Sequence, residues 1–464
     1  MDVSRDYETF LASKAVHPEP SGFEPTLGRA PHLFAFQVHV VDWALRRGRA
    51  AVFADCGLGK TAIQLEWARH VVDRSGPVLI LAPLAVAPQT VREGARWGVV
   101  VRYALDQEDA GAAPIVITNY ERLDRFDLTR FCGVVLDESS ILKSFMGKTK
   151  RELVERCAAI PYRLACTATP APNDHMELGN HAEFLGVMSS HEMLARWFLN
   201  DTKSFGTYRL KGHAVESFWD WVGSWAMCCA TPSDLGYSDD GYALPPLEIE
   251  THIVDVDLET EDLRPGELFR LPDLNATGLH REKRRTVEDR AARVSEIVAA
   301  EPRETWLIWC DTNYEADALR RVLPSSVEVR GSQSRDRKER AALDFVDGKT
   351  PVLISKPKLF GFGLNFQHCA RVAFIGTSYS YESFYQAVRR TWRFGQPRPV
   401  HVHVVVARTE YSVWSTLMAK REGHDAMRCA MSDAVRRAAA RTSALAPYQP
   451  TRDLRVPAWL REAS

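Results

Sequence analysis

Short apolar runs alternate with longer amphipathic segments along most of the chain, beginning near residue 31. The runs are rich in valine, isoleucine and leucine, and polar or glycine-containing residues bound each of them. This pattern is typical of strands that are buried inside a parallel sheet. A first series of strands is predicted at Ala50–Ala54, Val78–Ala82, Ile115–Thr118, Val134–Leu136 and Tyr162–Thr167.

A second series of similar runs follows after a long gap. Its strands are predicted at Thr305–Cys310, Ser326–Arg330, Pro351–Ile354, Ala370–Ile375 and Val400–Ala407. Helical segments separate these strands, for example at Thr312–Val322 and Arg335–Phe345. Two successive series of strands and helices predict an α/β protein with two lobes, each built on a mostly parallel sheet.

The stretch between the two series, from about His175 to Arg303, has a different composition. Its tryptophans, which we expect to pack between helices, are Trp197, Trp219, Trp221 and Trp225. The whole pattern predicts four segments: an irregular arm over residues 1–30, a first lobe with a helical insertion over 31–240, a second lobe over 241–430, and a C-terminal helix and tail over 431–464.

Composition narrows the classes of protein that the chain can belong to. Lys and Arg number 59 and Asp and Glu number 60, so a uniformly basic nucleic-acid binder is excluded, although local basic grooves are not. The nine cysteines include no C-x-x-C pair, which predicts reduced core thiols rather than a zinc site. A polar start and the lack of an apolar run of about 18 residues predict a cytoplasmic protein.

A phosphate-binding loop is the first candidate for chemistry. Ala54–Thr61 follows a predicted strand and opens an amphipathic helix, so its backbone N–H groups can surround a phosphate at the positive end of that helix. Gly57 and Gly59 let the backbone of the loop approach the phosphate closely, and Lys60 is expected to reach the β- and γ-phosphates. The Thr61 hydroxyl is expected to coordinate Mg²⁺. Ala54 stands where the general pattern has glycine.

Paired carboxylates at the end of another strand are the second candidate. Asp137 and Glu138 follow the run Val134–Leu136. Asp137 is expected to hold the Mg²⁺ shell, and Glu138 to orient or deprotonate the attacking water. Hydrolysis at such a site also needs a cation opposite the γ-phosphate, and the first lobe offers no obvious arginine for that position.

With these elements the chain resembles a superfamily 2 helicase-type ATPase, in particular the Swi/Snf-like DNA translocases and the compact forms that phages and prophages carry. The resemblance runs from about Leu33 to Val406 in the motif order of the family. Further segments that fit its motifs are Phe36–Gln37, Leu81–Leu84, Thr118–Tyr120, Thr167–Pro170 with Asn173, Gly361–Gln367 and Gln386–Gln396.

The resemblance implies two tandem RecA-like lobes that hold ATP and Mg²⁺ in the cleft between them. Gln37 then recognises the adenine, Gly363 lies beside the nucleotide, and Arg390 and Arg393 point across the cleft as arginine fingers. A bacterial or phage-infected cell is the implied setting. Arg389, which lies on another side of the predicted helix, is expected to be a surface or DNA-side charge.

The resemblance also implies that DNA is the partner and that its phosphates are contacted without reading base sequence. The candidates for these contacts are Asn119, Ser355, Lys356, Lys358, Asn365 and Gln367. Two other functions stay open: a helicase that separates strands of DNA or RNA, and a nucleotide-gated DNA-binding scaffold with negligible hydrolysis.

The chain departs from the family pattern at two places. Ser139 and Ser140 follow Glu138 where many relatives have alanine and histidine, so the usual histidine link to the Thr167–Pro170 motif is missing or replaced. Ala168 stands where Swi/Snf-like enzymes usually have glycine. No chromatin-reading, zinc or nuclease segment is recognisable, which argues against nucleosome remodelling as the function.

Overall fold

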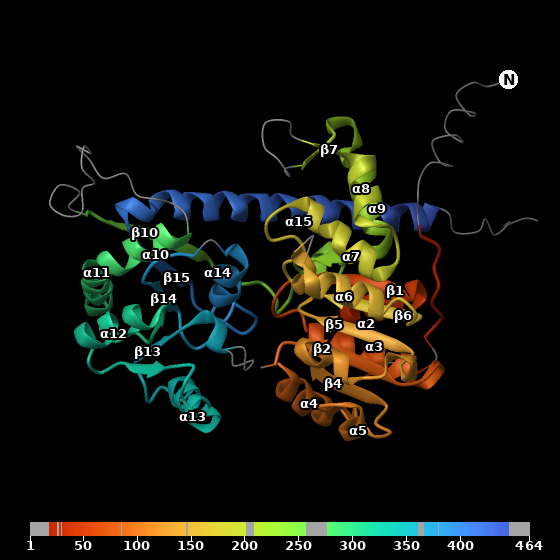
Figure 1. Ribbon diagram of the computed structural model, residues 1–464, viewed down its shortest axis with the longest axis horizontal. Helices are drawn as coiled ribbons and strands as arrows, with labels where there is room; N and C mark the ends of the chain where they lie inside the picture. Colours follow the sequence, from red (N-terminus) through yellow and green to blue (C-terminus); the bar gives the residue numbers. More distant parts are fainter. Residues whose placement is uncertain are drawn as a thin grey trace, which may run out of the picture.

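The computed structural model describes residues 18–25, 27–28, 30–84, 86–144, 147–200, 208–256, 276–360, 366–378 and 380–444. Within them, two parallel sheets flanked by helices form two lobes that lie side by side (Figure 1). This arrangement confirms the predicted fold class of two tandem RecA-like lobes. No helix in the described residues is long and apolar enough to cross a membrane.

The first lobe is built on a seven-stranded sheet with the order β3-β4-β2-β5-β6-β1-β9, in which all pairs are parallel. Its strands are β1 (Arg49–Ala54), β2 (Val78–Ala82), β3 (Arg102–Tyr103), β4 (Ile115–Asn119), β5 (Gly133–Asp137), β6 (Tyr162–Cys166) and β9 (Ala226–Cys229). Its helices before the insertion are α2 (Ala35–Arg47), α3 (Lys60–Arg74), α4 (Ala87–Arg96), α5 (Gln107–Ala110) and α6 (Lys148–Arg156).

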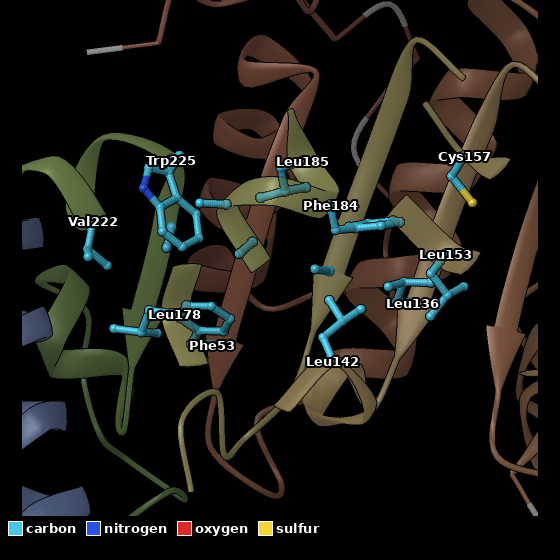
Figure 2. Close-up of a cluster of buried hydrophobic side chains, with 14 of the residues drawn as sticks. Phe53, Leu136, Leu142, Leu153, Cys157, Leu178, Phe184, Leu185, Val222 and Trp225 are labelled. Atoms are coloured by element: carbon cyan, nitrogen blue, oxygen red, sulfur yellow. The ribbon is translucent and has the colours of Figure 1, made fainter. Parts of the chain in front are cut away.

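A helical insertion leaves this lobe after β6 and returns at β9. It comprises α7 (Leu178–Leu185), α8 (Ser190–Trp197), the antiparallel pair β7 (Phe198–Asn200) and β8 (Tyr208–Leu210), and α9 (Val215–Trp225). The predicted packing of its tryptophans is confirmed, since all four are buried. Figure 2 shows Trp225 and Leu178 beside Phe53 of β1, so the insertion packs directly on the first sheet.

The second lobe is built on a six-stranded sheet with the order β10-β15-β14-β11-β13-β12, again with parallel pairs throughout. Its strands are β10 (Leu247–Val254), β11 (Trp306–Trp309), β12 (Val327–Val329), β13 (Val352–Ser355), β14 (Arg371–Phe374) and β15 (Val400–Ala407). Its helices are α10 (Ala276–Arg285), α11 (Val287–Ala300), α12 (Asn313–Val322), α13 (Arg335–Val346) and α14 (Tyr381–Val388).

The long helix α15 (Tyr411–Ala444) ends the described chain and runs along one side of both lobes (Figure 1). Trp414 and Leu417, near its start, belong to the core of the second lobe. Met427 and Met431, farther along, belong to the core of the first lobe. The sequence predicts a C-terminal helix from residue 431, but α15 begins at Tyr411. The earlier start follows because its apolar side chains pack first in the core of the second lobe and then in the core of the first. The domain boundaries themselves stay predictions.

The cysteines fit the expectation of reduced core thiols. None of the nine forms a disulfide, and most of them are buried; Cys429 on α15 is exposed.

Candidate active site: the cleft between the lobes

The phosphate loop connects β1 to α3 and needs glycine at two positions. Gly57 and Gly59 have φ angles of 93° and 78°, which side chains other than glycine rarely adopt. A Cβ atom on Gly59 would also lie 2.3 Å from Nε2 of Gln37. Lys60 begins α3, and its Nζ donates hydrogen bonds to the carbonyl oxygens of Ala54 (3.0 Å) and Asp55 (3.3 Å). The Lys60 amine therefore lies against the loop with which it is predicted to bind phosphate.

One cleft of about 360 Å³ collects most of the predicted nucleotide residues from both lobes. The first lobe contributes Gln37, Gly57, Gly59, Lys60, Thr61, Asp137 and Glu138, and the second lobe contributes Gln386, Arg389, Arg390, Arg393 and Phe394. Residues from distant stretches of the sequence therefore face the same space, as the predicted cleft between the lobes requires. Gly363 lies outside the described residues.

The two carboxylates end β5 in different environments. Gln64 donates a hydrogen bond of 2.7 Å from Nε2 to Oδ1 of Asp137, which fixes the orientation of that carboxylate. Glu138 has a φ of 55° and is the only residue other than glycine in the described chain with a positive φ. This conformation costs about 1 kcal/mol or more and is frequent where a side chain must be aimed at a functional site.

Burial and neighbouring charges shift the pKa values of the two carboxylates and of the Lys60 amine. Burial raises the pKa of both Asp137 and Glu138, and Lys60 partly offsets that rise. For Lys60, burial would lower the pKa, but the acidic groups around it, Glu138 and Asp55 among them, raise it overall. The oxygen atoms of Thr61 and Asp137, which line the same cleft, suit the hard, oxygen-preferring Mg²⁺ ion.

The departures from the family pattern have a structural counterpart. The Thr167 hydroxyl donates to Oε2 of Glu138 at 3.3 Å, and Thr169 N–H donates to the Thr167 hydroxyl at 3.1 Å. This link joins the two motifs without the usual histidine. His181 of α7 lies 3.1 Å from the Ser139 hydroxyl, and burial lowers its pKa to about 4, so it is neutral there.

The pair Arg390 and Arg393 lies where the resemblance placed it. Both line the cleft opposite Lys60 and Glu138, just beyond the end of α14. Burial lowers the pKa of Arg393 to about 10, which still leaves the guanidinium charged at neutral pH. Their roles in catalysis stay predictions.

The expectation for Arg389 is wrong. It is 4% exposed rather than a surface charge, and its guanidinium lies 3.1 Å from Oδ2 of Asp55 in the phosphate loop. It also lies over the ring of Trp392, 4.8 Å from the centroid. Helix periodicity placed it away from Arg390 and Arg393, but α14 ends at Val388, so the helical spacing does not extend to these arginines.

Gln37 lies behind the phosphate loop and is 4% exposed. Its Nε2 donates to Leu58 O at 3.0 Å, and its Oε1 accepts from Phe34 N–H at 3.0 Å. One amide hydrogen and one lone pair are left over, so recognition of adenine by Gln37 stays a prediction.

Aromatic side chains also line this cleft, and Phe394 alone among them lies in a segment that fits a family motif. Tyr242 lies in the connection between the lobes, 5.6 Å from Phe34 and 5.0 Å from Phe394 between ring centroids. His32 stacks on Trp97 at 4.8 Å. A planar base can bind among such rings.

The residues predicted to contact DNA differ in how exposed their side chains are. Gln367 is exposed and Lys356 is half-buried, so both are accessible. Asn119 is only 6% exposed and donates to Glu121 at 2.6 Å, which leaves it little access to a phosphate in this conformation. Ser355 is fully buried and donates to Val329 O, so the expected contact is wrong for it. Asn365 and the side chain of Lys358 lie outside the described residues.

A buried acid next to the Thr167–Asn173 motif makes stability depend on pH. Burial raises the pKa of Glu177 to about 7 against the opposing hydrogen bonds from Asn173. Its folded pKa exceeds its unfolded one, so the folded state loses stability as pH rises from about 4.3 to 7. Glu177→Gln is therefore expected to stabilise the chain by about 2 kcal/mol more at pH 8 than at pH 5. Urea unfolding at both pH values measures this, and an equal gain at both would contradict it.

Comparisons with known proteins match this chain to helicase sequences and to a phage protein. Residues 289–395 match the model of the helicase conserved C-terminal domain. A phage protein, putative protein p41 of Acyrthosiphon pisum secondary endosymbiont phage 1, is 23% identical over 469 residues, covering 87% of this chain and 98% of its own length.

Two eukaryotic relatives match shorter stretches. ATP-dependent DNA helicase DDM1 of Arabidopsis thaliana is 27% identical over 36% of this chain, and ATP-dependent helicase brm of Drosophila melanogaster is 27% identical over 35%. The matched stretches span only 25% and 11% of those two proteins. Among solved structures, a Sulfolobus solfataricus SWI2/SNF2 ATPase core in complex with dsDNA aligns with a TM-score of 0.43 at 18% identity, over 88% of this chain and 96% of that one.

The helicase C-terminal match lies in the second lobe and contains Arg390 and Arg393. The phage relative extends over most of the chain, and the two eukaryotic relatives are named as helicases. The chain therefore resembles the Swi/Snf-like superfamily 2 helicase-type ATPases, in particular their compact phage type.

Proposed function

We propose that the chain is an ATP-dependent DNA translocase that moves on duplex DNA. The observation that carries this proposal is the single cleft in which Lys60 and Glu138 of the first lobe face Arg390 and Arg393 of the second. A small-molecule kinase with a phosphate loop would not need the segments Gly361–Gln367 and Gln386–Gln396, whereas a motor needs its chemistry to depend on lobe closure.

Six residues of the cleft have a place in the proposed hydrolysis. Lys60 binds the β- and γ-phosphates, and Glu138 takes the proton of the attacking water. Arg390 and Arg393 offset the negative charge that builds up as the γ-phosphoryl group leaves. Thr61 and Asp137 would hold Mg²⁺, which neutralises charge on the phosphate oxygens when it is bound.

Contacts between the lobes offer a route from chemistry to movement. The carboxylate of Glu382 on α14 accepts hydrogen bonds from the Ser140 hydroxyl and the Lys143 amine, both at 2.5 Å. Ser140 follows Glu138 closely in the sequence, so the catalytic segment of the first lobe is tied directly to the helix before Arg390 and Arg393. Closing and opening of these contacts once per ATP would step two DNA-binding surfaces along the backbone.

The test compares substrates. ATP turnover is measured with duplex DNA, single-stranded DNA and RNA, and we expect duplex DNA to stimulate it most. In parallel, displacement of a triplex-forming third strand and unwinding of a forked duplex are measured with ATP. We expect the third strand to be displaced and the fork to stay paired, because a tracking motor need not separate strands. DNA affinity should fall steeply with salt, since phosphate contacts release counterions.

Strand separation is the second candidate, and one structural feature favours it. The antiparallel pair β7 and β8 lies beside a hollow of about 590 Å³ that Arg209 of β8 and Lys420 of α15 help to line. An antiparallel strand pair beside a groove that contains basic side chains can act as a wedge between the strands of a duplex. Efficient fork unwinding without third-strand displacement would make this the function. No stimulation of turnover by any nucleic acid would favour the nucleotide-gated scaffold instead.

A further inference from the structure

A buried carboxylate in the phosphate loop makes contacts that the proposed hydrolysis does not use. Asp55 is 7% exposed, and its Oδ1 accepts hydrogen bonds from Cys56 N–H at 2.6 Å and from the Tyr385 hydroxyl. Its Oδ2 lies 3.1 Å from the guanidinium of Arg389 and 3.3 Å from that of Arg428. Both oxygens are therefore bound by charged or polar groups.

The three side chains that contact the Asp55 carboxylate come from elements outside the sheet of the first lobe. Tyr385 lies in α14 and Arg389 directly follows it, both in the second lobe, whereas Arg428 lies in α15. Arg428 sits where α15 passes from one core to the other, next to Met427, which packs in the core of the first lobe. The C-terminal helix thus reaches, with a side chain from the far end of the sequence, the loop that is expected to bind phosphate.

The charge of Asp55 depends on these partners. Burial by itself would raise the pKa of Asp55, but Arg389 and Arg428 lower it overall, so the carboxylate is ionised. Asp55 also contributes to the raised pKa of Lys60. A buried anion without its cations would lie in the loop that must accept a polyanion, and it would compete with phosphate for Lys60.

We propose that Arg428 is a positioning residue for the nucleotide site: together with Arg389 it neutralises Asp55 and holds the phosphate loop ready for ATP. The inference rests on the proposed ATPase function. It makes α15 a component of the nucleotide site, because the position of this helix sets how well the loop is neutralised. Arg428 lies outside the residues that match the helicase C-terminal model.

This role has a signature that a merely structural role lacks. If Arg428 acts by neutralising Asp55, its removal must matter only while residue 55 is charged. A general loss of packing would harm ATP binding whether residue 55 is charged or neutral. The coupling between the two positions in a double-mutant cycle therefore tests the inference.

The experiment uses the full chain and four proteins: the parent, Arg428→Met, Asp55→Asn and the double variant. Methionine keeps much of the apolar stem of arginine and removes its charge. Affinity for a fluorescent ATP analogue is measured without DNA, and KM and kcat for ATP with DNA. We expect Arg428→Met to weaken binding and raise KM at least about tenfold, with kcat changed less than about threefold. We expect the loss caused by Arg428→Met to disappear when residue 55 is asparagine, so the double variant should match the Asp55→Asn variant.

Two further variants serve as controls, one for the loss of any arginine from α15 and one for the charge at position 428. Arg436→Met removes another arginine of α15, which pairs with Asp234 of the first lobe at 2.8 Å, and it should leave ATP affinity unchanged. Arg428→Lys keeps the charge without the planar fork, and it should lose less affinity than Arg428→Met.

The outcomes separate this inference from the proposed function. Parental ATP affinity in Arg428→Met would overturn the role of Arg428 while ATP binding by the parent stands. The same conclusion would follow if Arg428→Met caused an equal loss of affinity in the parent and in the Asp55→Asn variant. A parent chain that binds no ATP would overturn the proposed function, and the nucleotide role of Arg428 with it.

Discussion

Replacing Glu138 by glutamine is expected to lower ATP turnover at least ~100-fold while ATP still binds, because that is the scale of a lost general base. Glutamine keeps the size of the side chain and can still accept a hydrogen bond from the Thr167 hydroxyl. It cannot take a proton from water at neutral pH. The positive φ of Glu138 is a property of the backbone, and it aims either side chain at the same cleft.

Turnover and nucleotide affinity should be measured on the same preparations, because only their combination identifies a base. Lys60→Ala is the matched comparison, since Lys60 lines the same cleft but is expected to bind the phosphates. That variant should lose affinity as well as turnover. A Glu138→Gln enzyme that hydrolyses at the parental rate would remove Glu138 from its assigned role.

The sequence predicts the cores of both sheets well, because a strand buried on both faces must be apolar along its whole length. Val78–Ala82 and Val400–Ala407 have the predicted bounds; the first is buried throughout, and the second is buried except at the half-buried His401 and His403. The missed strand β10 alternates between exposed and half-buried positions at the edge of its sheet, so it has no continuous apolar run. The strand β9 escapes prediction because its four residues directly follow a tryptophan-rich helix.

The candidate site is predictable only where chemistry is local in the sequence. The phosphate loop and the Asp137–Glu138 pair are contiguous, so spacing and residue type suffice. The ion pair between Asp55 and Arg428 joins a loop residue to a helix residue that no motif or spacing connects. It forms through the packing of α15 on both lobes, which no periodicity encodes. For Asn119 the motif is recognisable in the sequence, but the burial of its side chain is not, because burial is a property of the tertiary structure.

Arg393→Ala is expected to abolish DNA-stimulated hydrolysis, a loss of roughly 10³-fold or more by the scale of arginine fingers in other NTPases, with DNA affinity nearly intact. The reason is position. Arg393 lines the same cleft as Lys60 and Glu138, so its charge is expected to meet the phosphates of ATP and not those of DNA. The loss should appear in kcat, since the arginine acts where charge develops in the transition state.

The measurement pairs DNA-stimulated turnover with DNA binding at one fixed salt concentration, because phosphate contacts vary steeply with ionic strength. Arg398→Ala is the control: it is also an arginine, a little farther along the chain, but its exposed side chain pairs with Glu304 at 2.9 Å, outside the cleft. It should keep both properties. If Arg393→Ala instead loses DNA binding and keeps basal hydrolysis, Arg393 acts on the DNA-binding surface, and the cation opposite the γ-phosphate must come from Arg390 alone.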